Sequence, residues 1–127
     1  MSGARYLLDS HIFIWLDTGD RRISPALLNN LSRADQRFLS AATAWELGIK
    51  QAAGKLRLRI PIGTMLEQFR LVELPVTIRH ADSAAKLPFL HRDPFDRILL
   101  AQALEEGLIL VSADRRLADY GIPMLTV

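Results

Sequence analysis

Short runs of hydrophobic residues alternate along the chain with longer segments in which apolar residues recur at helical spacing. The clearest run is Leu-Ile-Leu-Val at residues 108–111, which no polar residue interrupts. A run of this kind is typical of a strand that is covered on both faces. Predicted strands cover Arg5–Asp9, Arg37–Ser40, Leu71–Leu74, Leu108–Ser112 and Met124–Thr126.

The segments between these runs carry the start and stop signals of helices. Ser24 and Pro25 are a favourable N-cap and first helical residue, while Gly54 and Gly107 stand where two helices are expected to end. Gly48 lies inside a predicted helix, where it is unfavourable, and it is expected to permit close approach of another element. Predicted helices cover residues 10–16, 25–31, 42–53, 61–69, 76–87, 94–106 and 113–120.

Strands that are separated by helices imply right-handed crossovers and a parallel sheet with helices on both faces, which is an α/β fold. The chain has 127 residues, of which 50% are hydrophobic, and this fits one compact domain spanning residues 1–127. Ligands of such sheets bind beyond the carboxyl ends of the strands.

Four acidic residues stand where a predicted strand gives way to a helix. They are Asp9, Glu46, Asp96 and Asp114. Since junctions of this kind lie along one edge of an open parallel sheet, the four carboxylates are expected to gather there. Carboxylates that lie close together repel one another unless a cation lies between them, and oxygen ligands favour Mg²⁺ or Mn²⁺ over zinc. The pattern therefore predicts a divalent cation site for metal-dependent phosphodiester chemistry.

Taken alone, the first two acids also have structural interpretations. Asp9 can cap the helix that follows it, and Glu46 can form a surface pair with Lys50, four residues later. Trp45 and Ile49 flank the second acid and are expected to face the core, which would place Glu46 at the margin of the packed face near the sheet edge.

The later acids divide into ligands and supporting groups. Asp93 precedes a proline and is placed as an N-cap, so Asp96 is preferred as the metal ligand. Asp114 can be a cap or a ligand, and Ser112 at the strand end is expected to hold a neighbouring carboxylate in place. Ser10, which follows the first acid, is assigned the same supporting role.

The charge is mildly basic, with a net value of +2 and a pI near 9.4, which leans toward polyanionic partners. Several basic residues lie close in sequence to the acids, where ordinary solvated positions are the alternative to contact with phosphates. The candidates for substrate binding are Arg97, Arg115, Arg116, Lys50 and His11.

Other chemistries are poorly supported. The absence of cysteine excludes disulfides and thiolate metal sites, and neither a P-loop nor a Rossmann glycine motif is present. The histidines lack a short metal-ligand spacing, so His80 is expected on a helix surface and His91 in an exposed loop, with a phosphate contact as the alternative. The start of the chain lacks a signal-peptide pattern and no apolar run could span a bilayer, so a cytoplasmic protein without membrane contact is expected.

Several blocks resemble the PIN-domain family, and within it the VapC-type toxins of bacterial toxin–antitoxin pairs. The resemblance covers essentially the whole chain. It is carried by Leu-Leu-Asp-Ser-His at 7–11, Thr-Ala-Trp-Glu-Leu-Gly-Ile-Lys at 43–50 with Gly-Lys-Leu at 54–56, Asp-Pro-Phe-Asp-Arg-Ile-Leu at 93–99, and Leu-Val-Ser-Ala-Asp at 110–114.

The resemblance implies a five-stranded, mainly parallel sheet in a three-layer α/β/α sandwich. It implies an endoribonuclease that depends on Mg²⁺ or Mn²⁺, forms a homodimer, and is inhibited by a cognate VapB-type antitoxin whose C-terminal segment lies across the active site. The four acids of the family fall on Asp9, Glu46, Asp96 and Asp114, and its preceding hydroxyl residue falls on Ser112.

Two rival interpretations stay open at this point. A phosphotransfer enzyme also places an aspartate after its first strand, but the dehalogenase-like type requires a second aspartate where this chain has His11. A non-catalytic RNA- or protein-binding module could use the same fold, although the complete set of acids argues against it.

Overall fold

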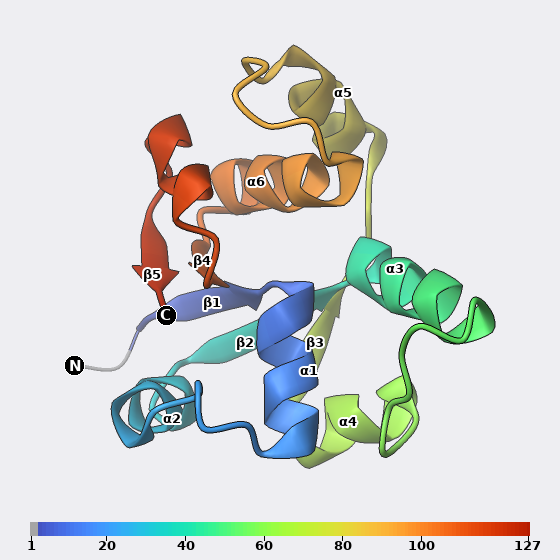
Figure 1. Cartoon of the computed structure of the whole chain (residues 1–127). Helices are drawn as coiled ribbons and strands as arrows, with labels where there is room; N and C mark the ends of the chain where they lie inside the picture. Colours follow the sequence, from blue (N-terminus) through green and yellow to red (C-terminus); the bar gives the residue numbers. More distant parts are fainter. Residues whose placement is uncertain (1–2) are drawn as a thin grey trace.

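The central sheet of the computed structural model, which describes residues 3–127, consists of five parallel strands (Figure 1). Their order across the sheet is β3-β2-β1-β4-β5, so both β1 and β4 have neighbours on each side. The strands are β1 (Arg5–Leu8), β2 (Gln36–Ser40), β3 (Leu71–Leu74), β4 (Ile109–Ser112) and β5 (Met124–Thr126). The parallel sheet predicted from the alternation of strands and helices is confirmed.

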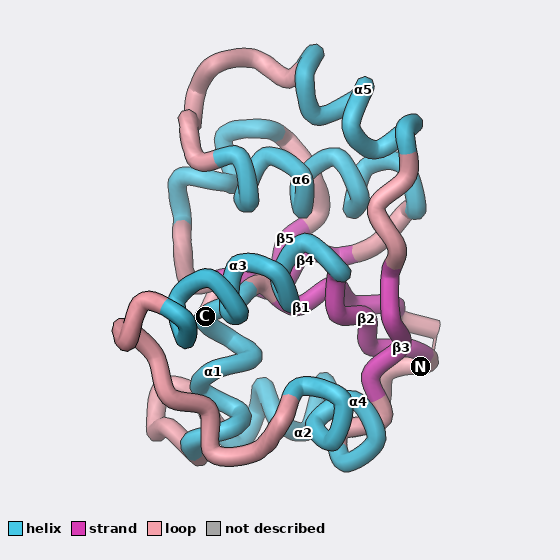
Figure 2. The backbone as a smooth tube through the Cα atoms, turned by 90° about the vertical axis from the view of Figure 1, so that its right-hand side faces the viewer, coloured by secondary structure: helices cyan, strands magenta, loops and turns pink. Residues whose placement is uncertain are grey.

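Helices cover both faces of this sheet, and the three-layer arrangement is confirmed (Figures 1 and 2). Helices α1, α2 and α4 lie on one face, and α5 and α6 lie on the other. Helix α3 lies beyond the carboxyl end of β2, where it contacts β2 and α6. The helices are α1 (Ser10–Thr18), α2 (Pro25–Ser32), α3 (Ala41–Ala52), α4 (Ile62–Gln68), α5 (Ile78–Lys86), α6 (Pro94–Glu106) and the 3₁₀ helix η1 (Arg115–Tyr120).

Alternation along the strands divides the core into two clusters. In β1, Leu8 packs in the cluster with α1 and α2, whereas Leu7 packs with α6 on the opposite face. In β4, Val111 and Leu110 divide in the same way. Successive side chains of a strand point to opposite faces, so a continuous apolar run supplies both layers of the core.

The expected surface position of His80 is wrong, because its side chain is buried. Helix α5 begins at Ile78, and Thr77 caps it by accepting a hydrogen bond from the His80 N–H at 3.2 Å. The His80 ring completes the capping box by accepting from the Thr77 N–H, and its other nitrogen lies 2.9 Å from a carboxylate oxygen of Glu106. The side chain is therefore buried because its polar atoms are used within the protein.

The expected core positions of Trp45 and Ile49 are also wrong. Both are exposed, Trp45 by 68%, and the residues of α3 that are buried are Thr43 and Leu47. Two stripes with the same four-residue spacing run along this helix, and the spacing alone does not decide which one faces the sheet. The ring of Trp45 instead contacts Phe95 of α6 edge to face, with centroids 5.6 Å apart.

Gly48 is exposed on α3, and the close approach of another element expected there is absent. A Cβ at this position would meet nothing within 4 Å, and the backbone is ordinary helix. We therefore expect Gly48→Ala to stabilise the protein by about 0.5–1 kcal/mol, because alanine has the better helix propensity. Urea unfolding monitored by circular dichroism would check this, and destabilisation would reveal a constraint that the structure does not contain.

No helix within residues 3–127 is long and apolar enough to cross a membrane.

Candidate metal centre

Asp9 lies at the carboxyl end of β1 and begins the site. Its N–H donates to the Val111 carbonyl of β4 at 3.1 Å, which ties it to the neighbouring strand. Its carboxylate caps α1 by accepting from the Ile12 N–H at 3.0 Å. The residue is only 4% exposed, and the adjacent Ser10 is buried as well.

Asp96 enters the site from the first turn of α6. Asp93 is the N-cap of this helix, where its Oδ1 accepts from the N–H groups of Phe95 and Asp96. The side chain of Asp96 is left for other contacts, and its Oδ2 lies 2.7 Å from Nε2 of His91. The predicted role of Asp93 as the N-cap is confirmed.

Asp114 follows β4 and caps η1. Its carboxylate accepts from the Arg116 side chain at 2.8 and 3.0 Å and from the Arg116 N–H at 3.0 Å. These hydrogen bonds hold the pKa of Asp114 below its usual value. Its own N–H donates to Oγ of buried Ser112 at 3.0 Å.

Burial raises the pKa of two of the acids. For Asp9 the loss of hydration outweighs hydrogen bonds from Ser112 and the start of α1, so its pKa lies above 3.8. For Asp96 burial is again the largest cause, the hydrogen bond from His91 opposes it, and the negative charges of Asp93 and Asp9 add to it. Negative charge is therefore costly here without a compensating cation.

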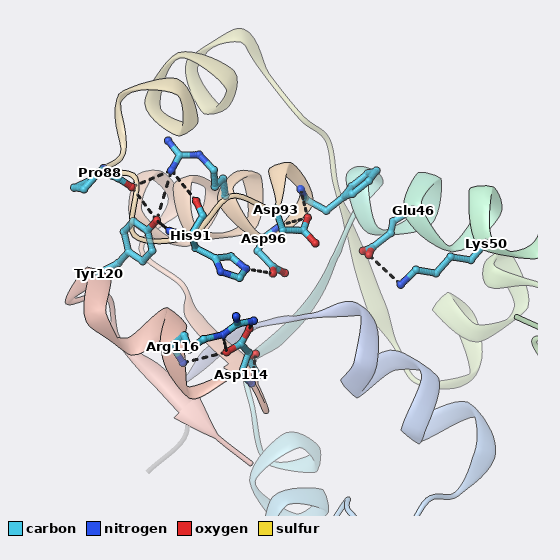
Figure 3. A network of polar contacts seen from close by, with 12 residues as sticks. Glu46, Lys50, Pro88, His91, Asp93, Asp96, Asp114, Arg116 and Tyr120 are labelled. Carbon is cyan, nitrogen blue, oxygen red and sulfur yellow. Dashed lines mark hydrogen bonds and ion pairs between the residues drawn. The ribbon is translucent and has the colours of Figure 1, made fainter. Parts of the chain in front are cut away.

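Three side chains meet closely enough to share one cation (Figure 3). Ligand atoms of His91, Asp96 and Asp114 all lie within 4.8 Å of one another. The two carboxylates of this group supply oxygen ligands suited to a divalent cation, and the imidazole lies against them. Asp9 is not part of this close group, although its charge acts on Asp96. The residues thus fit a metal ion, as the sequence predicted, but with a histidine that the prediction did not include.

Glu46 is not part of this close group. It projects from α3 and pairs with Lys50, with 3.2 Å between the carboxylate oxygen and Nζ. The surface pair that the sequence allowed is therefore present, although the Glu46 side chain is mostly buried at 13% exposure. Its role as a catalytic or metal-binding residue stays a prediction.

Arg97 contradicts its expected role as a phosphate-binding residue. It is 7% exposed, and its guanidinium donates to the tyrosine hydroxyl of Tyr120 and to four backbone carbonyls. These belong to Ala84, Leu87, Pro88 and His91. The side chain is committed to holding the connection between α5 and α6 against α6, so it is not available to a substrate.

The remaining basic candidates lie at the surface. Arg115 and His11 are exposed, and the ring of His11 lies 6.1 Å from that of Trp15. Lys50 and Arg116 are each paired with an acid of the predicted site, Glu46 and Asp114 respectively. Contact of these four residues with substrate stays a prediction.

His91 is the residue that the sequence analysis missed. Pro88 and Pro94 flank it and two charged residues follow it, a pattern typical of an exposed loop. The one available signal was its position five residues before Asp96, but a spacing across a loop carries no periodicity from which contact can be inferred. Its placement depends on Tyr120, which lies 29 residues away, and on Arg97, which the sequence predicts to bind substrate.

Comparisons with known proteins identify the family and the fold. The PIN domain family matches residues 6–123. The chain is 32% identical over 120 residues to Ribonuclease VapC22 of Mycobacterium tuberculosis, covering 92% of each protein. Residues 6–123 are nearly the whole chain, so both findings concern the same unit.

Solved structures show the same fold at low sequence identity. VapBC2 from Rickettsia felis, bound to a promoter DNA fragment, matches with a TM-score of 0.71 at 15% identity, covering 96% of this chain and 98% of that one. VapBC-1 from nontypeable Haemophilus influenzae matches at 0.71 and 18% identity, covering 96% and 97%. A toxin–antitoxin complex from Klebsiella pneumoniae matches at 0.69 and 22% identity, covering 95% and 96%. With its sheet order, its acids at the strand ends and these matches, the chain belongs to the PIN-domain family.

Proposed function

We propose that this protein is an endoribonuclease toxin that hydrolyses RNA phosphodiester bonds with Mg²⁺ or Mn²⁺ and is inhibited by a cognate antitoxin. The observation that carries the proposal is the meeting of Asp96 and Asp114 at the carboxyl edge of a PIN-domain sheet, near enough to buried Asp9 for its charge to act on Asp96. The likeness to a ribonuclease over nearly the whole chain supports RNA as the substrate.

The proposed roles follow from the contacts of each side chain. Asp9, Asp96 and Asp114 would hold the cation, with Glu46 joining directly or through water. A bound divalent ion lowers the pKa of a coordinated water and stabilises the negative charge that grows on the phosphate. Ser112 supports the centre through its hydrogen bonds to Asp9 and to the Asp114 N–H.

The supporting and substrate-binding roles are part of the same proposal. Asp93 and Ser10 keep the first turns of their helices in place beside the acids. Arg115 and His11 are exposed and able to contact RNA phosphates. The paired residues Lys50 and Arg116 would do so once a cation shares the charge of their carboxylate partners.

Cleavage of total cellular RNA by the purified, antitoxin-free protein tests the proposal. Discrete fragments are expected with Mn²⁺ or Mg²⁺, and none with EDTA or with Asp114→Asn. Asp119→Asn is a matched control, because Asp119 is an exposed acid of the same 3₁₀ helix. Metal-independent RNA binding without cleavage would support the non-catalytic binding module instead.

A cognate antitoxin and a homodimer are the proposed protein partners. The antitoxin is supported by the toxin–antitoxin complexes that share this fold. The dimer is supported by an exposed apolar groove between α3 and the start of α6. It is lined mainly by Trp45, Ile49, Val76, Pro94, Phe95 and Ile98. A contiguous apolar surface of this kind is typical of interfaces between identical chains.

Trp45→Glu is expected to convert such a dimer to monomer, because it places a charge at the centre of the apolar groove. Sedimentation velocity of the antitoxin-free protein would measure the change in mass. Leu104→Glu, at an exposed leucine outside the groove, is expected to leave the mass unchanged. A wild-type protein that is already monomeric at high concentration would contradict the dimer.

A further inference from the structure

The main chain at His91 is held from two directions. The His91 N–H donates to the Tyr120 hydroxyl at 2.9 Å, and its carbonyl accepts from Arg97 at 3.2 Å. The same two residues also bind Pro88, through Tyr120 at 2.8 Å and Arg97 at 2.9 Å. The loop between α5 and α6 is therefore attached to both α6 and η1, although five of its seven residues (87–93) are exposed.

This attachment directs the imidazole to the metal centre (Figure 3). The His91 side chain is 11% exposed, and its Nε2 lies 2.7 Å from Oδ2 of Asp96. A carboxylate oxygen only accepts, so Nε2 must carry the hydrogen in this contact. A nitrogen that carries a hydrogen has no lone pair to offer a cation, and the short contact therefore favours hydrogen bonding over metal ligation.

We propose that His91 is a positioning residue of the metal centre: its hydrogen bond holds Oδ2 of Asp96 and leaves Oδ1 for a cation that Asp114 would also bind. This inference rests on the metal-binding part of the proposed function and not on cleavage of RNA. Hydrogen bonds that fix the orientation of a ligand typically contribute about 10–100-fold to metal affinity. Arg97 and Tyr120 contribute indirectly, because their hydrogen bonds hold the main chain of His91 in place.

The need for such a partner follows from the position of Asp96. It stands in the first turn of α6, where Asp93 already accepts the Asp96 N–H. The Asp93 charge also opposes that of Asp96. A carboxylate in this position has an electrostatic reason to turn away, and the hydrogen bond from His91 opposes that rotation.

Titration calorimetry with MnCl₂ on the metal-free protein tests the proposal. His91→Leu keeps much of the side-chain volume without a donor, and is expected to lower the Mn²⁺ affinity by about 10–100-fold. His91→Gln keeps an N–H donor at similar reach and is expected to restore most of that loss. Tyr120→Phe keeps the imidazole but removes one main-chain attachment, so a smaller loss is expected even if His91→Leu folds poorly.

Electron paramagnetic resonance of the Mn²⁺-loaded wild type separates positioning from ligation. Positioning predicts that the spectrum lacks the coupling of a directly bound imidazole nitrogen. Such a coupling, removed in His91→Gln, would overturn the proposal and make His91 a ligand. Equal Mn²⁺ affinity in folded His91→Leu would overturn it as well. A wild type that binds Mn²⁺ but leaves RNA intact would refute the nuclease while leaving the His91 result valid.

Discussion

Asp9→Asn is expected to melt at a higher temperature than the wild type without divalent ions, and at a lower temperature with them. Asparagine is as good an N-cap as aspartate, so the cap on α1 through Ile12 is retained. The variant removes a buried negative charge whose hydration is lost on folding. Without a cation this loss of charge is favourable, and with a cation it removes a ligand.

The difference in stability between Asp9→Asn and the wild type in metal-free buffer depends on pH, because the pKa of Asp9 is raised in the folded state. Burial raises the pKa of Asp9 above 3.8, so the folded state binds its proton more tightly than the unfolded state. The cost of the charge is therefore complete above the folded-state pKa, shrinks as the pH falls toward 3.8, and is absent below 3.8. The advantage of Asp9→Asn in metal-free buffer is accordingly expected to be largest near neutral pH and to narrow toward pH 4.

The stabilisation of the wild type by a bound cation can be calculated from its concentration relative to its Kd. A ligand at one hundred times its Kd stabilises the state that binds it by about 2.7 kcal/mol. For a domain of this length the corresponding rise in Tm is about 10 °C. The wild type should show this rise with MnCl₂ in a thermal melt, and Asp9→Asn should lose most of it.

Asp119→Asn provides the matched control for these melts, since it removes an exposed acid without touching the centre. It is expected to follow the wild type in both buffers. If Asp9→Asn were instead less stable than the wild type without metal, Asp9 would have a structural role that its burial and capping contacts do not explain.

The elements themselves were largely predictable, because their signals are local. Ser24 with Pro25 starts α2, and Gly107 ends α6 in the left-handed conformation that glycine tolerates. The apolar run of β4 reads as a strand because both of its faces are covered. Of the four acids predicted to gather at one sheet edge, Asp96 and Asp114 meet closely, whereas Asp9 and Glu46 lie outside that close group.

The errors at Arg97 and His80 have a different cause, which is that a polar or charged side chain does not by itself indicate exposure. Arg97 and His80 are buried because backbone carbonyls, a backbone N–H and a carboxylate from other segments satisfy their polar atoms. Glu106 and Ala84 lie 26 and 13 residues away, and their arrangement around the two side chains exists only in the folded chain. Local periodicity also cannot choose between equally spaced stripes, which is why Trp45 was expected inside.

The position of His91 could not be predicted from the sequence. It is a polar residue that is mostly buried, and it lies in a loop without periodicity. Its imidazole reaches Asp96 only because Arg97 and Tyr120 fix the loop. The sequence predicts His91 in an exposed loop and Arg97 in contact with substrate, so neither prediction brings the two residues together. Once Arg97 is recognised as buried, the loop is no longer an exposed connection, and a histidine beside the carboxylates becomes understandable.

Arg97→Met is expected to destabilise the protein by about 3–5 kcal/mol, because each buried carbonyl left without its donor costs about 1–3 kcal/mol. Methionine fills part of the volume but leaves the carbonyls of Ala84 and Leu87 without their donors at 2.8 Å. The loop bearing His91 loses its attachment to α6 at the same time. Thermal melts should show a fall in Tm of roughly 10–20 °C.

Arg97→Lys is expected to recover little of this loss, because one ammonium group cannot reproduce the planar fork that meets four carbonyls. Arg115→Met is the matched control, and as an exposed substitution it should change stability by less than about 0.5 kcal/mol. If Arg97→Met kept the wild-type Tm but bound RNA more weakly, the guanidinium would be contacting phosphate, and its buried contacts would have to be exchangeable. A fall in stability shared by Arg97→Met and Arg97→Lys would instead identify this arginine as the structural link between the α5–α6 connection and the metal centre.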